Sequence, residues 1–369
     1  MNGFTLRRLG ILMEPEPGNP LEVEGVLNPA AVRGHDGELY LFPRMVAKGN
    51  YSRIGIARVQ FDRAGDPKGV ERLGIALEPK ADYELHPDGG GGCEDPRVTY
   101  VEPLKRYIMT YTAFSARGPR IAVAQSEDLL HWSRMGLATY NLWHNIQLGD
   151  EDDKDASFFP VAVPDSTGHL QLAMLHRPLF AGTRPEEIAR WPAGRRMDIE
   201  KESIWISYTK GIVTSEGSPH LAKFTSHHRL ATPVSPWERL KIGAGTPPVL
   251  SRHGWLILYH GVSKAAGDQA DGCHLVYSAG VMVLSRKHPR VILYRSSEAV
   301  MVPSLPQERS GTIANVVFPT GIDRRDDLGT PDRFDVYYGM AYNRIGVARL
   351  DVPAVLPAGG IADLPRSFF

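Results

Sequence analysis

A pair of carboxylates follows a run of four glycines in the sequence GGGGCEDPRV, which spans Gly89–Val98. Glycine tracts cost conformational entropy on folding and are kept where the backbone must bend sharply or lie close to another group. A carboxylic acid held in such a loop is able to protonate a leaving oxygen. The stretch therefore indicates either a long surface turn or a loop that delivers Asp95 into a crowded pocket, and the rest of the chain must decide between them.

Polar side chains recur at matching places in five segments of the chain, near the start of each segment and near the end of its second strand. The set is Asn28, Asp95, Lys154, Asp155, Lys241 and Asn315 at the starts, and Arg44, Tyr111, Arg177, His260 and Tyr338 at the ends. Their surroundings, such as LAMLHRP and LILYHGV, are apolar, and a charge buried there without a partner is strongly unfavourable. Single members have structural explanations, as hydrogen-bond donors, solvated turn residues or turn caps, but the recurrence predicts one shared, ligand-filled cavity.

The set combines groups that bind an anion with groups that bind and protonate a sugar. Arginine, lysine and histidine around a cavity suit phosphate, which they hold by charge-assisted hydrogen bonds. Asp95 supplies an acid, and amide and aromatic side chains suit a sugar. A phosphate with about two negative charges would be repelled by Asp95 unless cations surround it. The sequence has no P-loop, dinucleotide-binding fingerprint, nucleophile elbow or HExxH motif.

Five copies of one pattern must position these residues. Each copy has a small residue or proline at its start, a few apolar residues, a turn and a short aromatic-rich strand. The copies read NPAAVRGHDGELYLFPRM from Asn28, EDPRVTYVEPLKRYIMTYTAF from Glu94, DASFFPVAVPDSTGHLQLAMLHRP from Asp155, GTPPVLSRHGWLILYHGV from Gly245 and NVVFPTGIDRRDDLGTPDRFDVYYGMA from Asn315. Alternation of period two continues in a further strand after most copies, as in RIGIARVQ and RIAVAQSE.

The copies recur roughly 60 to 90 residues apart, which leaves room for about four strands in each repeat. Repeated four-stranded antiparallel units that close into a ring are typical of a β-propeller. Five copies therefore predict an all-β, five-bladed β-propeller with the active site in its central channel. A β-sandwich or two separate all-β domains are the alternatives, and neither requires five matching hairpins. We expect one domain over residues 1–369, with a non-repeating insertion near residues 180–200.

Composition argues against several classes of function. The chain has 42 lysines and arginines against 42 aspartates and glutamates, so bulk charge does not favour a nucleic-acid partner. Cys93 and Cys273 form neither a disulfide framework nor a CxxC zinc motif. The N-terminal apolar stretch breaks at Glu14 and Pro15, which is too short for a secretory segment, and no later apolar run reaches membrane-spanning length. We expect a soluble, cytoplasmic protein with no metal or organic cofactor.

Taken together, the motifs resemble glycoside hydrolase family 130, whose members include β-mannoside phosphorylases and β-1,2-mannosidases on a five-bladed propeller. The resemblance covers most of the chain, from about Asn28 to Val352. It rests on NPAAV…LYLFPR, EDPRV…YIMTYTAF, KDASFFP…LAMLHRP, KIGAGTPP…GWLILYHGV and NVVFP…VYYGMA, which occur in this order. These motifs are specific as a group, because all five stand in order in one chain.

The resemblance implies a reaction and a role for each matching residue. Asp95 matches the catalytic acid, which protonates the glycosidic oxygen through the sugar's C3 hydroxyl while phosphate attacks C1 with inversion to give α-mannose 1-phosphate. Lys154, Arg177 and His260 match phosphate-binding positions. The positions assigned to the sugar are Asn28, Arg44 and Lys241, to which we add Tyr111, Asn315 and Tyr338 from the repeat pattern. Inorganic phosphate and a small oligosaccharide are the expected partners, and a homo-oligomer is left open.

Two departures from the family pattern leave alternatives open. Phosphorylases often have Arg-Asn where this chain has Lys154–Asp155, and Asp155 is a possible base for water if the enzyme is an inverting exo-β-glycosidase. The family usually has aspartate at Tyr342, where it commonly holds sugar hydroxyls, so the identity of the sugar is open. Basic residues at Lys154 and Arg177 favour the phosphorylase. A non-catalytic carbohydrate-binding propeller is the third hypothesis.

Overall fold

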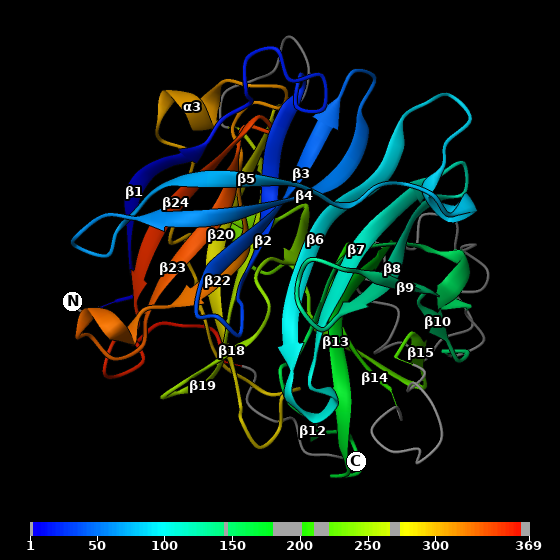
Figure 1. Cartoon of the computed structure of the whole chain (residues 1–369). Helices are drawn as coiled ribbons and strands as arrows, with labels where there is room; N and C mark the ends of the chain where they lie inside the picture. The colour runs from blue at the N-terminus through cyan, green and yellow to red at the C-terminus, as the bar shows by residue number, and fades with distance from the viewer. Residues whose placement is uncertain (1–2, 144–146, 180–200, 210–220, 266–273, 363–369) are drawn as a thin grey trace.

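The computed structural model describes residues 3–143, 147–179, 201–209, 221–265 and 274–362. Within these ranges almost all regular structure is β-strand, arranged as five antiparallel units of four strands each (Figure 1). We number the units blades 1 to 5 in chain order. The predicted insertion near residues 180–200 lies outside the described residues. No helix in the described ranges is long and apolar enough to cross a membrane.

The strands of each blade follow one another in chain order, apart from short additional strands, with one exception in blade 5. Blade 1 contains β2 (Gly25–Arg33), β3 (Leu39–Ala47), β4 (Tyr51–Phe61) and β5 (Pro67–Leu77), and blade 2 contains β6 (Gly91–Val101), β7 (Arg106–Ser115), β8 (Gly118–Ser126) and β9 (Ser133–Leu137). Blade 3 contains β11 (Asp152–Phe158), β13 (Leu170–Leu179), β14 (Ile204–Thr209) and β16 (Ser226–Ala231), and blade 4 contains β17 (Lys241–Ala244), β19 (Gly254–Lys264), β20 (Leu275–Leu284) and β21 (Ile292–Arg295). Blade 5 contains β22 (Val317–Arg324), β23 (Arg333–Met340), β24 (Arg344–Asp351) and β1 (Thr5–Met13).

Shorter elements lie between or beside the blade strands. The additional strands are β10 (Thr139–Tyr140), β12 (Val163–Pro164), β15 (Lys223–Phe224) and β18 (Val249–Ser251). The helical turns are η1 (Asp82–Glu84), η2 (Glu102–Leu104), η3 (Leu148–Asp150), η4 (Pro236–Glu238), α3 (Pro306–Arg309) and η5 (Asp326–Leu328).

Five apolar clusters show that the blades form a ring, because one cluster lies at each of five blade–blade interfaces. Residues of blades 1 and 2 share one cluster, as do those of blades 2 and 3, 3 and 4, and 4 and 5. The fifth cluster joins Leu41 of blade 1 to Tyr337 of blade 5. Period-two alternation places these side chains on the faces where neighbouring sheets pack. The prediction of an all-β, five-bladed propeller is confirmed.

The N-terminal strand completes the last blade. β1 pairs antiparallel with β24, with Thr5 opposite Asp351 and Met13 opposite Ile345. Figure 1 shows β1, in blue, running alongside β24, in red. Blade 5 thus joins the first strand to the last described strand, and backbone hydrogen bonds between them close the ring.

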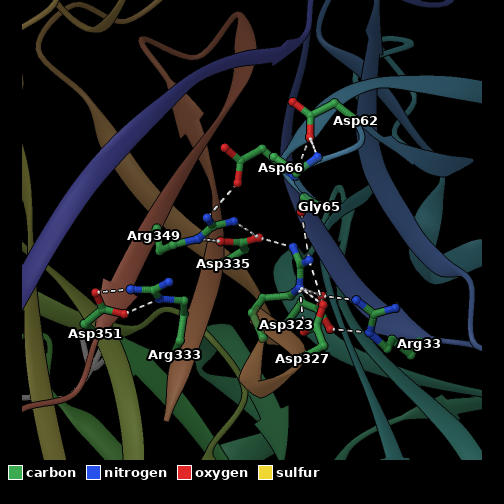
Figure 2. Close-up of polar contacts among 12 residues, drawn as sticks. Arg33, Asp62, Gly65, Asp66, Asp323, Asp327, Arg333, Asp335, Arg349 and Asp351 are labelled. Carbon is green, nitrogen blue, oxygen red and sulfur yellow. Dashed lines mark hydrogen bonds and ion pairs between the residues drawn. The ribbon is translucent and has the colours of Figure 1, made fainter. Parts of the chain in front are cut away.

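A network of arginines and aspartates also joins blade 5 to blade 1 (Figure 2). Arg33 of β2 makes two hydrogen bonds to Asp323 of β22, at 2.8 and 2.6 Å. Arg349 of β24 contacts Asp66 of the β4–β5 turn at 2.6 Å and donates two further bonds to Asp335. Bidentate pairs of this kind fix orientation as well as distance, so they hold the two blades in register.

A repeated glutamate clamp ties the loop before a blade to that blade's outermost strand. Each glutamate accepts two backbone N–H groups at a helical turn, a tyrosine hydroxyl from the second strand and an arginine from the outermost strand. The three sets are Glu84 with Tyr111 and Arg134, Glu238 with Tyr259 and Arg295, and Glu308 with Tyr338 and Arg8. All three carboxylates are buried, and every clamp satisfies them with charge-assisted hydrogen bonds.

Three β-bulges turn polar side chains out of the first strands. The pairing register shifts after Leu27, after Glu94 and after Lys154. The next residues, Asn28, Asp95 and Asp155, have left-handed backbone with φ of 45°, 45° and 58°. Asparagine and aspartate tolerate this conformation better than other side chains, and a bulge re-aims the residue it contains. Local backbone geometry therefore explains why these three positions carry short amide or carboxylate side chains.

Two of the four glycines before Glu94 are required by close packing of the backbone. Gly91 and Gly92 begin β6 beside β4, with φ of 74° and 107°. A Cβ atom on Gly92 would lie 2.2 Å from the Ser52 carbonyl oxygen, and one on Gly91 would lie 2.4 Å from that of Phe114. These glycines are therefore not part of an ordinary surface bend, because they let the chain enter the first strand of blade 2 and reach Asp95.

Candidate active site

Asp95 lies at the centre of a buried hydrogen-bonded group from blades 1 and 2. Its Oδ1 accepts a hydrogen bond from Asn28 Nδ2 at 2.9 Å and one from Arg44 Nη1 at 3.3 Å. Asn28 and Arg44 are each 1% exposed, and Asp95 is 9% exposed. Of the described residues, none donates a hydrogen bond to the other carboxylate oxygen. The carboxyl group is thus oriented through one oxygen and presents the second to a ligand.

Arg44 is held by every nitrogen of its guanidinium group. It donates to Ser52 Oγ at 2.9 Å, to Asn50 Oδ1 at 3.0 Å and to Glu94 Oε1 at 2.8 Å. Burial lowers the pKa of Arg44, but Glu94, Tyr342 and Asp95 outweigh burial and raise it, so the side chain stays charged. A rigid cation beside Asp95 stabilises the carboxylate form that follows proton transfer.

Tyr342 adds a phenol to this group. Its hydroxyl accepts a hydrogen bond from Arg44 Nη1 at 3.2 Å, and its ring centroid lies 5.4 Å from the Arg44 guanidinium carbon. Ala341 and Tyr342 both have left-handed backbone, with φ of 45° and 59°. Burial raises the pKa of the Tyr342 hydroxyl, so it keeps its proton at neutral pH. A neutral donor therefore stands where the family resemblance places a carboxylate.

Asp155 lies in a second group, which brings together blades 2, 3 and 4. Its Oδ2 accepts a hydrogen bond from Arg177 Nε at 2.6 Å, and its Oδ1 lies 3.5 Å from Arg97 Nη2. Burial would raise the pKa of the Asp155 carboxyl, but the positive charges of Arg177 and Arg97 outweigh burial and hold it well below its ordinary value. A carboxylate so strongly ion-paired is a weak base, which argues against the prediction that Asp155 activates water.

Arg97 joins the two groups into one site. Its guanidinium donates to the Asp95 carbonyl oxygen at 2.8 Å and to the Gly245 carbonyl oxygen at 2.8 Å, while its Nη2 faces Asp155. Arg97 is 1% exposed, and its guanidinium carbon lies 5.7 Å from the centroid of the Phe318 ring. Asp95 and the basic residues are therefore parts of one continuous polar cluster between the first strands of the blades.

His260 has two buried ring nitrogens that are available to bind a ligand. It is 1% exposed, and neither ring nitrogen has a hydrogen-bond partner among the described residues. Its Nε2 lies 3.7 Å from Asp155 Oδ2, and its ring packs 4.4 Å from that of Phe318. Burial lowers the pKa of His260 to about 3, so the imidazole is neutral. Buried polar atoms are nearly always satisfied, so these nitrogens indicate a binding position.

Two lysines and one glutamate stand at the more exposed edge of the cluster. Lys154 Nζ lies 3.9 Å from Glu94 Oε2, and Lys241 Nζ lies 3.7 Å from Glu202 Oε1. Glu202 also forms an ion pair with Arg177. The side chains of Lys154 and Lys241 are 31% and 25% exposed. Both lysines are therefore accessible to a ligand that enters the cluster.

The predicted residues divide into those that the structure brings together and those that it does not. Asn28, Arg44, Asp95, Lys154, Asp155, Arg177, Lys241 and His260 all belong to the cluster. Tyr111 and Tyr338 do not, because their hydroxyls bind Glu84 and Glu308 in the glutamate clamps and their rings lie in the core. Their assignment to the sugar is corrected accordingly. Among the described residues, the Asn315 side chain has no hydrogen bond to the cluster.

Sequence reasoning missed three parts of the site. Arg97 stands two residues after Asp95 in the EDPR motif, and this proximity was an available signal. Gly243 lies under Asp155, where a Cβ atom would be 2.1 Å from Oδ2, and it belongs to the KIGAG motif. Glu202 lies outside the repeated motifs, so no pattern in the sequence pointed to it. Among the described residues, no group of three or more His, Cys, Asp and Glu side chains is placed to hold a metal ion.

Comparison with known proteins gives consistent matches over nearly the whole chain. Residues 10–358 match the model of a family described as beta-1,4-mannooligosaccharide phosphorylase. A 1,2-beta-oligomannan phosphorylase from Thermoanaerobacter sp. (strain X514) is 30% identical, over 95% of this chain and 98% of that protein. A Beta-1,2-mannobiose phosphorylase from the same organism is 30% identical over 72% of this chain and 68% of that protein.

Solved structures show the same fold at lower sequence identity. The Beta-1,2-mannobiose phosphorylase of Listeria innocua, in complex with beta-1,2-mannobiose, has a TM-score of 0.66 at 20% identity and covers 95% of this chain and 97% of its own. A putative glycoside hydrolase from Parabacteroides distasonis has a TM-score of 0.68 at 22% identity, over 96% of this chain and 97% of its own. At these identities the likeness shows the fold alone.

Proposed function

This chain belongs to glycoside hydrolase family 130 and is an enzyme, and we propose that it cleaves a β-mannoside with inorganic phosphate to give α-mannose 1-phosphate. The observation that carries the proposal is a single polar cluster that contains Asp95, Arg177 and His260. Arg97 links the Asp95 backbone carbonyl oxygen to Asp155, and Asp155 in turn contacts Arg177 and His260. An acid and an anion site next to each other are what an inverting displacement by phosphate requires.

Asp95 is the proton donor in this proposal. Asn28 and Arg44 orient the carboxyl group through Oδ1, which leaves Oδ2 to give its proton to the sugar. The charge of Arg44 then stabilises the aspartate that results. The family resemblance routes the proton through the C3 hydroxyl of the mannosyl unit to the glycosidic oxygen. The bond between C1 and that oxygen breaks as phosphate forms the new bond to C1 on the opposite face.

Lys154, Arg177 and His260 hold phosphate in this proposal. The two unsatisfied nitrogens of His260 offer one donor and one acceptor, which suits a phosphate that keeps a proton on one oxygen. Arg177 and Lys154 supply positive charge, and Lys241, which shares the Glu202 carboxylate with Arg177, adds a third cation to the same site. We propose that phosphate is the co-substrate and that no metal or organic cofactor takes part. A cytoplasmic location also remains a prediction.

The test compares products with and without phosphate. The purified protein is incubated with β-1,2-mannobiose, and with β-1,4-mannobiose in parallel, and the products are followed by proton NMR. We expect α-mannose 1-phosphate only when phosphate is present, with one of the two linkages strongly preferred. Release of free mannose at the same rate without phosphate would instead establish the inverting exo-β-glycosidase.

Asp95→Asn tests the assignment of the acid. We expect the rate of mannose 1-phosphate formation to fall by about a thousandfold, since general acid catalysis contributes factors of about 10² to 10⁴. Asp88→Asn is the matched control, because Asp88 precedes the same glycine run and its side chain is 89% exposed. Full activity in Asp95→Asn would refute the assignment.

A further inference from the structure

Glu202 stands where an anionic ligand would bind. Its carboxylate forms an ion pair with Arg177 Nη1, and its other oxygen lies 3.7 Å from Lys241 Nζ. A carboxylate that spans two basic side chains in this way uses the same charge-assisted contacts as two oxygens of a phosphate. Phosphate and Glu202 therefore need the same positive charges.

The charges of the cluster nearly cancel when Glu202 is included. The basic side chains are Arg44, Arg97, Lys154, Arg177 and Lys241, and the acidic ones are Glu94, Asp95, Asp155 and Glu202. These are five positive groups against four negative groups, with His260 neutral. This balance counts Asp95 as ionised, and a phosphate with about two negative charges would then leave one excess negative charge in the cluster. Whether or not Asp95 carries its proton, phosphate at Arg177 and Lys241 is repelled by the Glu202 carboxylate on the same two cations unless that carboxylate moves away.

Glu202 is the most exposed of the four carboxylates in the cluster. Asp155 is 3% exposed, is fixed by Arg177 and Arg97, and packs directly on Gly243. The Glu202 side chain is 25% exposed and reaches its two partners from the edge of the cluster. A glutamate at such a place can turn toward solvent at small cost, because water replaces its ion pairs.

We propose that Glu202 is a specificity-determining residue whose carboxylate competes with phosphate for Arg177 and Lys241. The inference rests on the proposed function, since phosphate is the competing anion. In the unliganded enzyme Glu202 neutralises the two cations. When phosphate binds, the carboxylate leaves the two cations and turns outward. Its negative charge therefore raises the KM and the Kd of the enzyme for phosphate.

The test removes the charge and measures phosphate affinity in two ways. Glu202→Gln and Glu202→Ala are compared with the wild type for the KM of phosphate during phosphorolysis and for the Kd of inorganic phosphate by calorimetry without sugar. We expect both constants to fall at least threefold in both variants, while the KM for mannobiose stays unchanged. Glu71→Gln is the control, because Glu71 also pairs with an arginine, Arg58, but at the exposed surface.

The two proposals fail in different ways. An unchanged or higher Kd for phosphate in Glu202→Gln and Glu202→Ala would overturn the role of Glu202, whatever reaction the enzyme catalyses. Sugar release at a rate that does not depend on phosphate would overturn the proposal that the enzyme is a phosphorylase. The calorimetric Kd for phosphate would still decide whether Glu202 competes with the anion. A fall in Kd with a matching rise in the KM for mannobiose would also contradict the inference, because it would place Glu202 in the sugar site.

Discussion

Gly243 lies directly against Asp155, so close that a Cβ atom at position 243 would stand 2.1 Å from the Asp155 Oδ2 atom and 2.4 Å from the His260 ring. Gly243 lies in β17 of blade 4 and Asp155 lies in β11 of blade 3, and these two strands pack on each other. The absence of a side chain at Gly243 is therefore what allows the carboxylate and the imidazole to occupy one space.

Gly243→Ala should disable the anion site while the fold is retained. The added methyl group must push Asp155 off Arg177 or tilt His260, and a displacement of about 1 Å in a catalytic group costs about a hundredfold in rate. We expect kcat/KM for phosphorolysis to fall by about that factor. Gly69→Ala is the control, since a Cβ atom there would meet nothing nearer than 3.8 Å. Equal activity in the two variants would contradict the tight packing.

Tyr111→Phe should lower stability and leave activity unchanged. The Tyr111 hydroxyl donates to Glu84 Oε1 at 2.5 Å, and Glu84 is fully buried. Loss of the hydroxyl therefore leaves the buried Glu84 carboxylate with one hydrogen-bond donor fewer. We expect the free energy of unfolding to fall by about 2 kcal/mol in urea titrations. A clear rise in the KM for the sugar, with stability unaffected, would return Tyr111 to the substrate site.

Stability should decrease as the pH falls below about 6.5, and His260 should account for part of the decrease. Burial lowers the pKa of His260 to about 3 in the folded protein, so between these pH values the unfolded chain binds a proton that the folded chain does not. The free energy of unfolding should therefore fall with decreasing pH, by up to about 1.4 kcal/mol per pH unit for each such histidine.

The measurement compares this slope between pH 6 and pH 4 in the wild type and in His260→Gln. We expect the variant to show a shallower slope, by about 1 kcal/mol per pH unit. His288→Gln is the control, because His288 is exposed in the loop after β20. A slope that His260→Gln leaves unchanged would mean that His260 is protonated in the folded protein.

Arg33→Met should weaken the closure between blades 5 and 1. Asp323 is 5% exposed, and burial raises the pKa of its carboxyl to about 6 although Arg33 lowers it. Without Arg33 the buried carboxylate loses a bidentate partner, and we expect unfolding to become easier by roughly 2 kcal/mol, between the values for surface and buried pairs. Arg58→Met, which breaks the surface pair with Glu71, should cost far less. Equal losses in the two variants would contradict a role in closure.

The repeats explain why the fold and most of the site were predictable from sequence. Period-two alternation and turn residues identified the hairpins, and their spacing indicated the blades. Asn28, Asp95 and Asp155 stood out because a left-handed bulge position tolerates asparagine and aspartate, so the same local constraint left the same kind of residue in three repeats.

The tertiary structure alone decided the partners of each side chain. Alternation assigns a residue to a face of its strand, but it does not say which loop or blade covers that face. Tyr111 therefore looked equivalent to His260, although a glutamate from the preceding loop holds its hydroxyl in the core. Glu202 belongs to no repeated motif, and only the folding of β14 beside β13 and β17 sets its carboxylate against Arg177 and Lys241. Sequence by itself determined the repeating unit and the acidic residue that it singles out, Asp95; which charges meet across the ring depends on contacts between residues far apart in the chain.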